Sequence, residues 1–382
     1  MDFYSTNSLS WDKLEYGTDA IQNLHYGLIH VGLSTMIDLS KDKLPNITNG
    51  NTPKNYELCQ EGDIAFADAS EDTNEVAKAV EFYKLNGKDV ICGLHTIHGR
   101  DNQQKTVVGY KGYAFSSTAF HHQIRRIAQG TKIYSINNKN FSECYIGIPS
   151  KEEQKKIATL LRLIDERIVT QNKIIDKLQS LIKGINQRVF MNNGINYKLG
   201  EISEIRSGYS GNQLLSKKGL KVSRIETISG HKVNLERVGY VAPFESSENY
   251  KLQVGDILFS NINSVEYIGN TAFIDKDYDL YHGMNLLRLT PNNMVVIPFY
   301  LYLLLNTNRM LNRFKTVCNK AVSQASINQT ELGKTVVQIP DINAQKQICE
   351  LYQALYDKLE SEKYANSLFQ KQKQYLLRQM FI

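Results

Sequence analysis

Apolar residues recur every three or four positions along two long stretches of the chain, and this spacing predicts two long helices. In the first stretch the recurring positions are Leu161, Ile164, Ile168, Gln171, Ile175, Leu178, Ile182, Ile185 and Val189. The register returns 191 residues later, with a more polar middle, at Tyr352, Leu355, Leu359, Glu362, Asn366, Phe369, Lys373, Leu376 and Met380. Each series is a heptad seam, the pattern that joins helices in a coiled coil.

A lone helix cannot bury such a seam, so we expect the two helices to pair within one molecule as an antiparallel coiled coil, with Gln171 or Asn366 helping to fix the register. The alternative is that each seam packs on its own domain. Ser150 and Glu153 have the spacing of a capping box at the start of the first helix. Gly194, in the Met-Asn-Asn-Gly stretch, is a candidate C-cap at its end. At 1.5 Å per residue, helices of about 40 residues would run roughly 60 Å.

The sequence also repeats itself outside these seams. Ile-Pro-x-x-x-x-Gln-Lys-x-Ile occupies residues 148–157 and again 339–348, each time just ahead of a predicted helix. Residues 61–68 (EGDIAFAD) match 254–261 (VGDILFSN), and 134–141 match 325–332. The chain is therefore a tandem duplication with diverged interiors. The opening of the second half, residues 197–213, has no evident counterpart at the start of the first, which puts the edge strand of the first domain in question.

Between the helices, short β-type runs alternate with Gly, Asn and Ser turn signals. We therefore predict an α+β fold, in which two mixed α/β domains are separated by the two long helices. The predicted boundaries are 1–147 for the first domain, 148–193 for the first helix, 194–338 for the second domain and 339–382 for the second helix. The most apolar stretch, Met294 to Leu305, is too short to span a bilayer and predicts a buried helix.

Charge and cysteine content narrow the picture only slightly. The formal net charge of +6 over 382 residues permits a polyanionic partner but does not require one. The five cysteines are scattered, with no Cys-x-x-Cys pair, which suits reduced thiols. The start of the sequence has no signal-peptide pattern. We expect a cytoplasmic protein without a membrane partner.

The plan resembles the specificity subunit of type I restriction-modification systems, in which two target-recognition domains alternate with two conserved helical regions. The resemblance is carried by IPSKEEQKKIATLLRLIDERI, IPDINAQKQICELYQALYDKL, YKLGEISEIRSGYS and GDIAFADASED. It implies that each domain reads one half of a bipartite target in double-stranded DNA, while the helices set the spacing and dock two DNA-methylation subunits. It also implies a non-catalytic subunit without a cofactor of its own. S-adenosylmethionine, ATP and Mg²⁺ would belong to those subunits and to the restriction and translocation subunits.

Local concentrations of basic and amide side chains mark candidate DNA contacts, because arginine suits guanine edges and glutamine suits adenine. In the first domain they are Arg100, Gln103, Gln104, Lys105, His121, His122, Gln123, Arg125 and Arg126. In the second they are Lys217, Lys218, Lys221, Arg224, His231, Lys232, Arg313, Lys315 and Lys320. The alternative for any single member is a solvated surface charge or a phosphate contact.

Two other patterns suggest chemistry, and each also has a plainer interpretation. The acidic run Asp63, Asp68, Glu71, Asp72, Glu75, with Lys78, suggests a nuclease metal site, but the Glu-to-Lys spacing is off by one and the second copy lacks the acids. Cys92, His95 and His98 have ligand-like spacing, yet a structural zinc needs four ligands. No phosphate-binding loop and no adenine-methylation motif occurs. A coiled-coil scaffold without DNA specificity, and a nuclease built on the acidic run, are the alternatives to a DNA reader.

Overall fold

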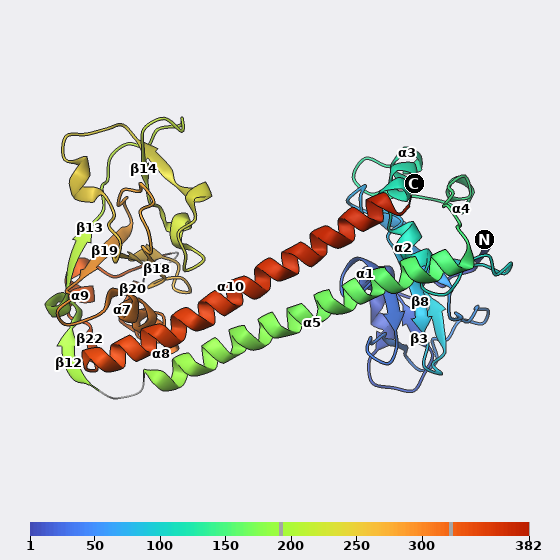
Figure 1. Cartoon of the computed structure of the whole chain (residues 1–382), viewed down its shortest axis with the longest axis horizontal. Helices are drawn as coiled ribbons and strands as arrows, with labels where there is room; N and C mark the ends of the chain where they lie inside the picture. The colour runs from blue at the N-terminus through green and yellow to red at the C-terminus, as the bar shows by residue number, and fades with distance from the viewer. Residues whose placement is uncertain (191–193, 321–323, 382) are drawn as a thin grey trace. The chain divides into compact units, whose positions relative to one another are not determined.

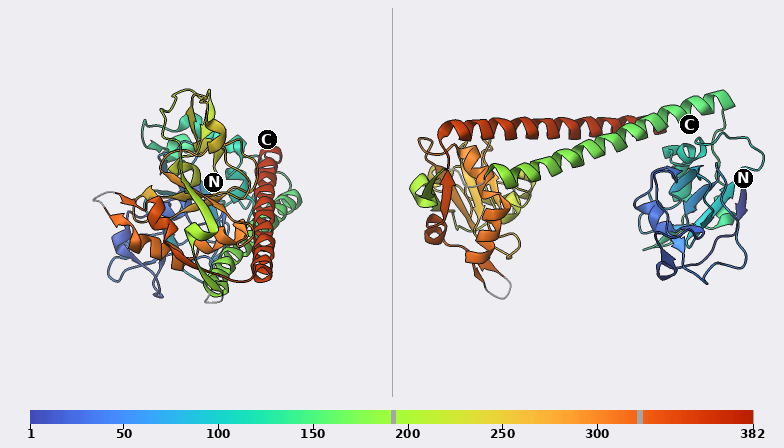
Figure 2. Two further views of the ribbon diagram at one scale, coloured as in Figure 1. Left: turned by 90° about the vertical axis from the view of Figure 1, so that its left-hand side faces the viewer. Right: turned by 90° about the horizontal axis from the view of Figure 1, so that it is seen from below.

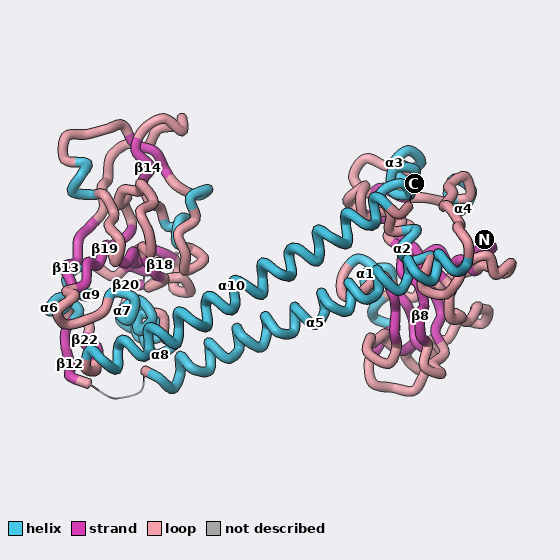
Figure 3. The backbone as a smooth tube through the Cα atoms, in the orientation of Figure 1, coloured by secondary structure: helices cyan, strands magenta, loops and turns pink. Residues whose placement is uncertain are grey.

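The computed structural model describes residues 1–190, 194–320 and 324–381, which form two compact units. The first unit comprises Met1–Lys173 with Lys363–Ile382, and the second comprises Ile174–Glu362. Each unit therefore contains one globular domain and parts of both long helices, α5 (Lys151–Val189) and α10 (Ile342–Gln379) (Figure 3). No helix in the described part of the chain is long and apolar enough to cross a membrane.

Two sheets form the globular part of the first unit. One has the order β1 (Asp2–Tyr4), β10 (Thr96–Arg100), β6 (Ile64–Ala67), β8 (Ala79–Lys84) and β4 (Met36–Asp38). All of its pairs are antiparallel except β4 with β8. The other has the order β2 (Leu14–Glu15), β5 (Asn46–Ile47), β3 (Gln22–Leu24) and β9 (Val90–Cys92). A two-stranded sheet pairs β7 (Ala69–Ser70) with β11 (Tyr134–Ser135).

Short helices cover the larger sheet of the first unit. They are α1 (Tyr26–His30), α2 (Lys111–Phe115), α3 (Thr118–Ile127) and α4 (Asn138–Phe141). Helix α2 contacts β8, and its Tyr113 packs in one apolar cluster with Leu161 of α5, so that α2 lies between the sheet and the first turns of α5 (Figures 1 and 2). Phe66 of β6 meets Phe115 and Phe141 at ring-centroid distances of 4.9 and 4.6 Å. This aromatic core fixes α2 and α4 on the sheet.

The second unit repeats the same plan with shorter sheets. Its central sheet has the order β13 (Ser203–Ser207), β19 (Leu286–Pro291), β16 (Ile257–Ser260) and β18 (Thr271–Phe273), all antiparallel. The smaller sheets are β12 (Ile195–Lys198) with β22 (Val336–Ile339), β14 (Leu220–Val222) with β15 (Gly239–Val241), and β17 (Ile262–Asn263), β21 (Ala325–Ser326) and β20 (Asn319–Lys320). Its helices are α6 (Leu199–Ile202), α7 (Pro298–Leu305), α8 (Asn308–Val317) and α9 (Gln329–Gly333).

Helix α7 is the predicted buried helix. It begins with Pro298 at its first position, where a missing N–H costs nothing. Five of its eight residues are buried, and they are Tyr300, Leu301, Leu303, Leu304 and Leu305.

The repeated Gly-Asp dipeptide closes the same turn in both units. The carboxylate of Asp63 accepts a hydrogen bond from the amide of Gln60 at 2.9 Å, and Asp256 does the same for Gln253 at 2.8 Å. Strands β6 and β16 follow these turns and pair with β10 and β19 in the same register, because Ile97 faces Phe66 as Leu287 faces Phe259. The duplication read from the sequence is therefore a duplication of structure.

The expectation about the edge of the first domain needs a correction. Strand β1 pairs with β10 as β13 pairs with β19, with Phe3 opposite Gly99 and Ile205 opposite Leu289. The edge strand is thus present at Asp2–Tyr4. Among the described residues, the two-stranded sheet of β12 and β22 in the second unit has no equivalent before α5 in the first. Sequence comparison missed β1 because it has only three residues and little identity with β13.

Both long helices begin with a side-chain cap. The amide of Glu153 donates to the Ser150 hydroxyl at 3.3 Å, which is one of the two bonds of the predicted capping box. Asp341 accepts from the amides of Asn343 and Ala344. The predicted end of the first helix falls on residues 191–193, which lie outside the described residues. Helix α5 already ends at Val189, so Gly194 is not its C-cap. Gly194 instead precedes β12 with φ +140°, where an added Cβ would lie 2.4 Å from the Ile339 carbonyl.

The two long helices pair through the predicted seam. In the second unit, Ile182 and Ile185 of α5 share an apolar cluster with Tyr352, Leu355 and Leu359 of α10. In the first unit, Leu161 of α5 shares a cluster with Leu376 and Met380, near the other end of α10. The pairing is therefore antiparallel, as predicted.

The long helices also pack on their own domains, which was the alternative to pairing. The apolar clusters that join the two helices include side chains of the globular domains. Tyr110 and Tyr113 join Leu161 in the first unit, and Leu303 joins Tyr352 in the second. Each helix is thus held by its own domain over its first turns and by the other helix along the seam.

Polar groups interrupt the seam within the first unit. Asn366 donates from Nδ2 to the Oδ1 of Asn172 at 2.8 Å, and Gln171 is buried. Asp165 lies 2.6 Å from the Lys373 ammonium and accepts from the Tyr113 hydroxyl at 2.9 Å. The polar middle read from the sequence is therefore made of contacts between the helices and with α2.

A buried histidine of the second unit predicts a measurable pH dependence. His282 is 1% exposed, and burial lowers its pKa from 6.5 to about 4. Since the folded-state pKa lies below the unfolded one, its contribution to stability is complete above about pH 6.5 and is lost as the pH falls. At pH 4 this group alone should lower the free energy of unfolding by about 3 kcal/mol relative to pH 7.

The measurement compares urea unfolding of the wild type and of His282→Gln across this pH range. Glutamine can keep the hydrogen bond to the Leu286 carbonyl, 2.9 Å from Nε2, but does not titrate. The variant should lose less stability on acidification, and equal slopes for the two proteins would contradict the prediction.

Candidate DNA interface

A pair of equivalent helices carries the densest predicted contacts. Helix α3 is capped by the Ser117 hydroxyl and α8 by that of Thr307. Each helix buries two apolar side chains, Phe120 and Ile124 in α3, and Met310 and Phe314 in α8. The opposite faces remain polar and basic, so both units present a ten-residue amphipathic helix at the same place in the fold.

Two of the predicted contacts on these helices are occupied within the protein. Gln123 accepts from the Tyr145 amide at 3.0 Å and donates to the Tyr145 carbonyl at 2.9 Å. Arg313, at the matching position of α8, donates to the Val336 carbonyl at 2.7 Å. Both side chains therefore fasten the helix to the strand-like segment that precedes the long helix. Arg313 remains exposed and, with Arg309, lines a hollow of about 250 Å³. Sequence reasoning passed over Arg309.

The remaining polar residues of α3 differ in how exposed they are and in whether they have hydrogen-bond partners within the protein. Arg125 is exposed but donates to Asn74 and lies 2.9 Å from His122. Arg126 is exposed, with no ion pair or hydrogen bond among the described residues. His121 is half-buried, and its Nδ1 has no partner there. Burial lowers the pKa of His121, with Arg125 adding to the effect, so it is neutral near pH 7.

The loop after β10 brings further candidates close to α3. Gln103, Gln104 and Lys105 are exposed. Gln103 and Lys105 line a hollow of about 320 Å³ with Tyr145, while His122 and Arg126 line a second hollow of about 200 Å³ that also includes Tyr145. The first-domain candidates from the two sequence clusters therefore meet on either side of Tyr145.

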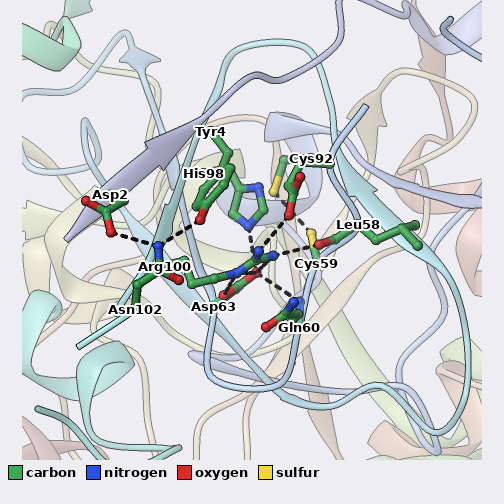
Figure 4. Close-up of polar contacts among 11 residues, drawn as sticks. Asp2, Tyr4, Leu58, Cys59, Gln60, Asp63, Cys92, His98, Arg100 and Asn102 are labelled. Carbon is green, nitrogen blue, oxygen red and sulfur yellow. Dashed lines mark hydrogen bonds and ion pairs between the residues drawn. The ribbon is translucent and has the colours of Figure 1, made fainter. Parts of the chain in front are cut away.

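Arg100 requires a correction, because it does not lie free for DNA. Its guanidinium donates to Asp63 at 2.8 and 2.9 Å, to Glu57 at 2.6 Å and to the Leu58 carbonyl at 2.7 Å (Figure 4). Every nitrogen of the group is thus engaged with protein oxygens. Arg100 supports the interior of the first domain, and we remove it from the DNA candidates.

This ion pair perturbs both of its partners. Burial alone would raise the pKa of Asp63, but hydrogen bonds from His98 and Arg100 outweigh burial and lower it. The hydrogen bonds that the Arg100 guanidinium donates to Asp63 and Glu57 raise the pKa of Arg100. Asp63 is 2% exposed, so it is an ionised carboxylate inside the domain.

The second-domain candidates away from α8 are mostly surface residues with local partners. Lys217 and Lys218 are exposed, Lys221 lies 3.6 Å from Asp279, and Arg224 lies 3.9 Å from Glu226. Lys232 pairs with Glu360 of α10 at 3.0 Å, and the His231 carbonyl accepts from Tyr302. On and after α8, Lys315 is half-buried and Lys320 is exposed. These exposed pairs cost little to open, so their side chains stay available to a polyanion.

The acidic run does not form a metal site. Asp63 binds Arg100, Asp68 contacts His95 at 3.1 Å, and Glu75 contacts Lys78 at 2.8 Å. Glu71 and Asp72 are exposed. Among the described residues, these acids do not gather into a group that could hold an ion. The run begins beside strand β6 and continues through β7 into turns.

The repeated Gln-Lys motif is evident in the sequence, but the structural role of its glutamine is not. Gln154 and Gln345 are both fully buried at the start of the long helices. Gln154 accepts from the Val107 amide at 2.9 Å and donates to the carbonyls of Lys105 and Pro149 at 3.1 and 2.8 Å. Gln345 makes the same three bonds to Ile297, Val295 and Pro340, at 2.8, 3.1 and 2.9 Å. These glutamines fasten each long helix to the domain that precedes it.

The long helices also leave large apolar side chains in water. In the first unit, Leu160, Leu163 and Tyr364 are 41, 52 and 66% exposed. In the second unit, Tyr356 packs partly into the seam cluster. Further exposed apolar residues on these helices are Val169, Leu181, Leu351, Leu368 and Tyr375. Such surfaces are typical of protein interfaces.

Comparison with known families decides the affiliation. The sequence profile of the type I restriction modification DNA specificity domain matches residues 42–180 and 194–367. The chain belongs to this family. The resemblance drawn from the repeated motifs is thereby confirmed, and the match includes both halves of the duplication.

Curated relatives agree with this affiliation. A putative type I restriction enzyme MjaX specificity subunit from Methanocaldococcus jannaschii is 43% identical over 150 residues, which are 38% of this chain and 35% of that protein. The type I restriction enzyme EcoKI specificity subunit from Escherichia coli is 25% identical over 278 residues, 65% of this chain and 58% of the relative. The aligned parts span less than two thirds of these relatives.

Solved structures confirm the fold class. The type I restriction-modification S subunit from M. genitalium matches with a TM-score of 0.58 at 16% identity, covering 100% of this chain and 93% of its own. A structure from a study of complex assembly and conformational transition of the type I R-M system gives the same TM-score and identity over 90% of this chain. The α+β fold of this specificity-domain chain, with its two domains and two long helices, is that of the family.

Proposed function

We propose that this chain is the DNA-reading subunit of a type I restriction-modification complex, and that each domain reads one half of a bipartite target. The observation that carries the proposal is the match of the DNA specificity profile to both copies of a duplicated fold. Two copies with one scaffold but different surfaces suit a target with two different halves. In this assignment residues 1–147 and 194–338 are the reading domains.

The long helices act as a spacer and as a docking surface for two methylation subunits. The spacer role is supported by the seam that joins α5 to α10 over residues of both units. The docking role is supported by the exposed Leu160, Leu163 and Tyr364, which a partner would cover. Catalysis, with S-adenosylmethionine, ATP and Mg²⁺, then resides in the methylation and restriction subunits.

The experiment uses the full chain in complex with its methylation subunits. The complex selects duplexes from a random library, and the modified adenines of host DNA are mapped. A bipartite motif with an unspecified spacer supports the proposal. A complex that methylates without sequence preference, or a chain that binds the partner but no DNA, would favour the scaffold alternative.

On α3, Arg126 is the sharpest candidate for a base contact, because its guanidinium has no described protein partner. Arg126→Ala should weaken recognition of the half-site read by the first domain, with a loss of about 1–3 kcal/mol of discrimination. Binding to variants of each half-site, measured by fluorescence anisotropy, gives the effect. Arg125→Ala should act in the same direction but less strongly, since Arg125 shares its nitrogens with Asn74 and His122.

The control is Lys43→Ala, which removes an exposed charge outside the candidate set. If Arg126 touches only a phosphate, its loss should weaken all sequences equally and reduce the salt slope by about 0.9. That result would reassign Arg126 from reading to positioning.

A further inference from the structure

Three side chains of metal-ligand type meet in the interior of the first domain. Cys59, Cys92 and His98 are 5, 2 and 0% exposed, and their ligand atoms lie within 4.8 Å of one another (Figure 4). The two sulfur atoms are 3.6 Å apart. A tetrahedral zinc ion with Zn–S bonds of about 2.3 Å holds two sulfurs roughly 3.8 Å apart. The sulfur pair is therefore already close to the separation that one ion requires.

The histidine of this cluster is oriented as a metal ligand would be. Its Nε2 lies 2.8 Å from the Asp63 carboxylate, while Nδ1 is buried without any hydrogen-bond partner in the described chain. In Figure 4 the ring lies between Asp63 on one side and Cys92 on the other. Zinc-bound histidines commonly donate their second N–H to a carboxylate, which fixes the tautomer and leaves the other nitrogen for the metal. An orphaned buried nitrogen otherwise costs free energy.

The duplicated half shows that the scaffold does not need these residues. The bridge between Leu58 and Ile91 matches the bridge between Lys251 and Tyr281, so Leu252 and His282 stand where Cys59 and Cys92 stand. His98 faces Ala65 as Arg288 faces Leu258. Leucine, histidine and arginine thus serve the same fold in the second unit. The gathering of two thiols and an imidazole in the first calls for a separate explanation.

We propose that Cys59, Cys92 and His98 bind one Zn²⁺ ion in the first domain. On binding, each thiol gives a proton to solvent and forms a Zn–S bond, and the Nδ1 lone pair forms the Zn–N bond. Two thiolates balance the charge of the ion, which favours a buried site. Asp63 orients the imidazole through Nε2–H, and a water molecule takes the fourth position, as in zinc sites with three protein ligands.

The proposed ligands differ from the Cys92, His95 and His98 pattern in the sequence. His95, which completed the Cys92-x-x-His95-x-x-His98 pattern, is exposed and contacts Asp68. Cys59, distant in the sequence, takes its place. Cys92 belongs to β9 and His98 to β10, strands of different sheets. The ion would therefore join the two sheets, and its binding free energy would add to the stability of the domain.

The test uses the full chain, purified without chelator and with thiols kept reduced. Elemental analysis should find one zinc per chain, and chelation should lower the melting temperature. Reconstitution with Co²⁺ alone should give the thiolate-to-cobalt charge-transfer absorption. Cys92→Ser should abolish this band and the bound zinc. Cys318→Ser, which removes a buried thiol of the second unit, should retain both.

Measurements on the wild-type protein are enough to refute the proposal. The test therefore stands even if a variant fails to fold. A chain with no stoichiometric zinc and no cobalt band, even after incubation with each metal, would refute the site. A disulfide between Cys59 and Cys92 in protein purified with reduced thiols would also refute the site. Mass spectrometry would detect it as a mass lower by two hydrogens. The DNA-reading function is measured separately by target binding, so the two proposals fail independently.

Discussion

Replacing Asp63 with alanine is expected to lower the free energy of unfolding by about 3–5 kcal/mol, because the change strands a buried cation. Asp63 is 2% exposed and takes two of the guanidinium nitrogens of Arg100 as well as Nε2 of His98. Glu57, which is partly exposed, can compensate only one nitrogen of Arg100. Urea unfolding of the full chain, followed by a probe in the first domain, measures the loss.

Asp256→Ala is the matched control for this experiment. Asp256 closes the same turn in the second unit but accepts only from neutral donors, the Gln253 amide and the Thr290 hydroxyl. Its loss should cost about 1–3 kcal/mol, the usual range for neutral partners left unsatisfied. If both substitutions have the same effect, the turn rather than the ion pair accounts for the stability.

Exchanging residues 200–338 for the corresponding domain of a relative is expected to change one half of the methylated motif completely and leave the other half intact. The first domain, α5 and α10 keep their own residues in such a chimera. The apolar face that meets α10 must be retained, because Leu303 packs with Tyr352 and Leu359. Mapping modified adenines in a host that carries the chimera and the methylation subunits gives the result.

The control replaces the same residues by the chain's own sequence recoded at the DNA level, which should leave the motif unchanged. A chimera whose motif changes in both halves, or in neither while methylation persists, would end the modular account. If the chimera gives no methylation, its binding to the methylation subunits is measured. A chimera that still binds these subunits would show that the domains cannot be exchanged independently, and the modular account would again be wrong.

The sequence predicted the features that depend on interactions between residues close together along the chain. The seam of α5 and α10 follows from steps of three and four, and the Ser150 cap follows from the hydroxyl's reach to an amide in the next turn. The buried helix α7 was visible because its apolar run is too long for a strand and too short for a membrane. Helix signals of this kind depend only on neighbours within one or two turns.

The contacts that the sequence did not predict are those that depend on strand pairing. Arg100 looked like a surface base because its neighbours are polar, yet its partner Asp63 is 37 residues away and was brought to it by the pairing of β10 with β6. Cys59 joined Cys92 for a similar reason, through the bridge of Leu58 to Ile91. On α3 the sequence showed the cluster of basic and amide residues but not the helix that carries them, so it did not reveal that His121 is half-buried or that Gln123 is bonded to Tyr145.

The two buried glutamines bear on how new specificities can arise in evolution. Gln154 and Gln345 bond only to main-chain groups, two of them in the preceding domain and the third the carbonyl of the proline in the Ile-Pro motif. A backbone group is the same whatever side chain it carries, so mutations that rewrite a domain's surface leave these bonds intact provided the loop keeps its path. Recombination just upstream of either Ile-Pro motif can then join a foreign domain to a resident helix without compensating changes at the junction. Inheritance of whole domains, followed by selection, is a shorter route to a new target than the accumulation of single substitutions.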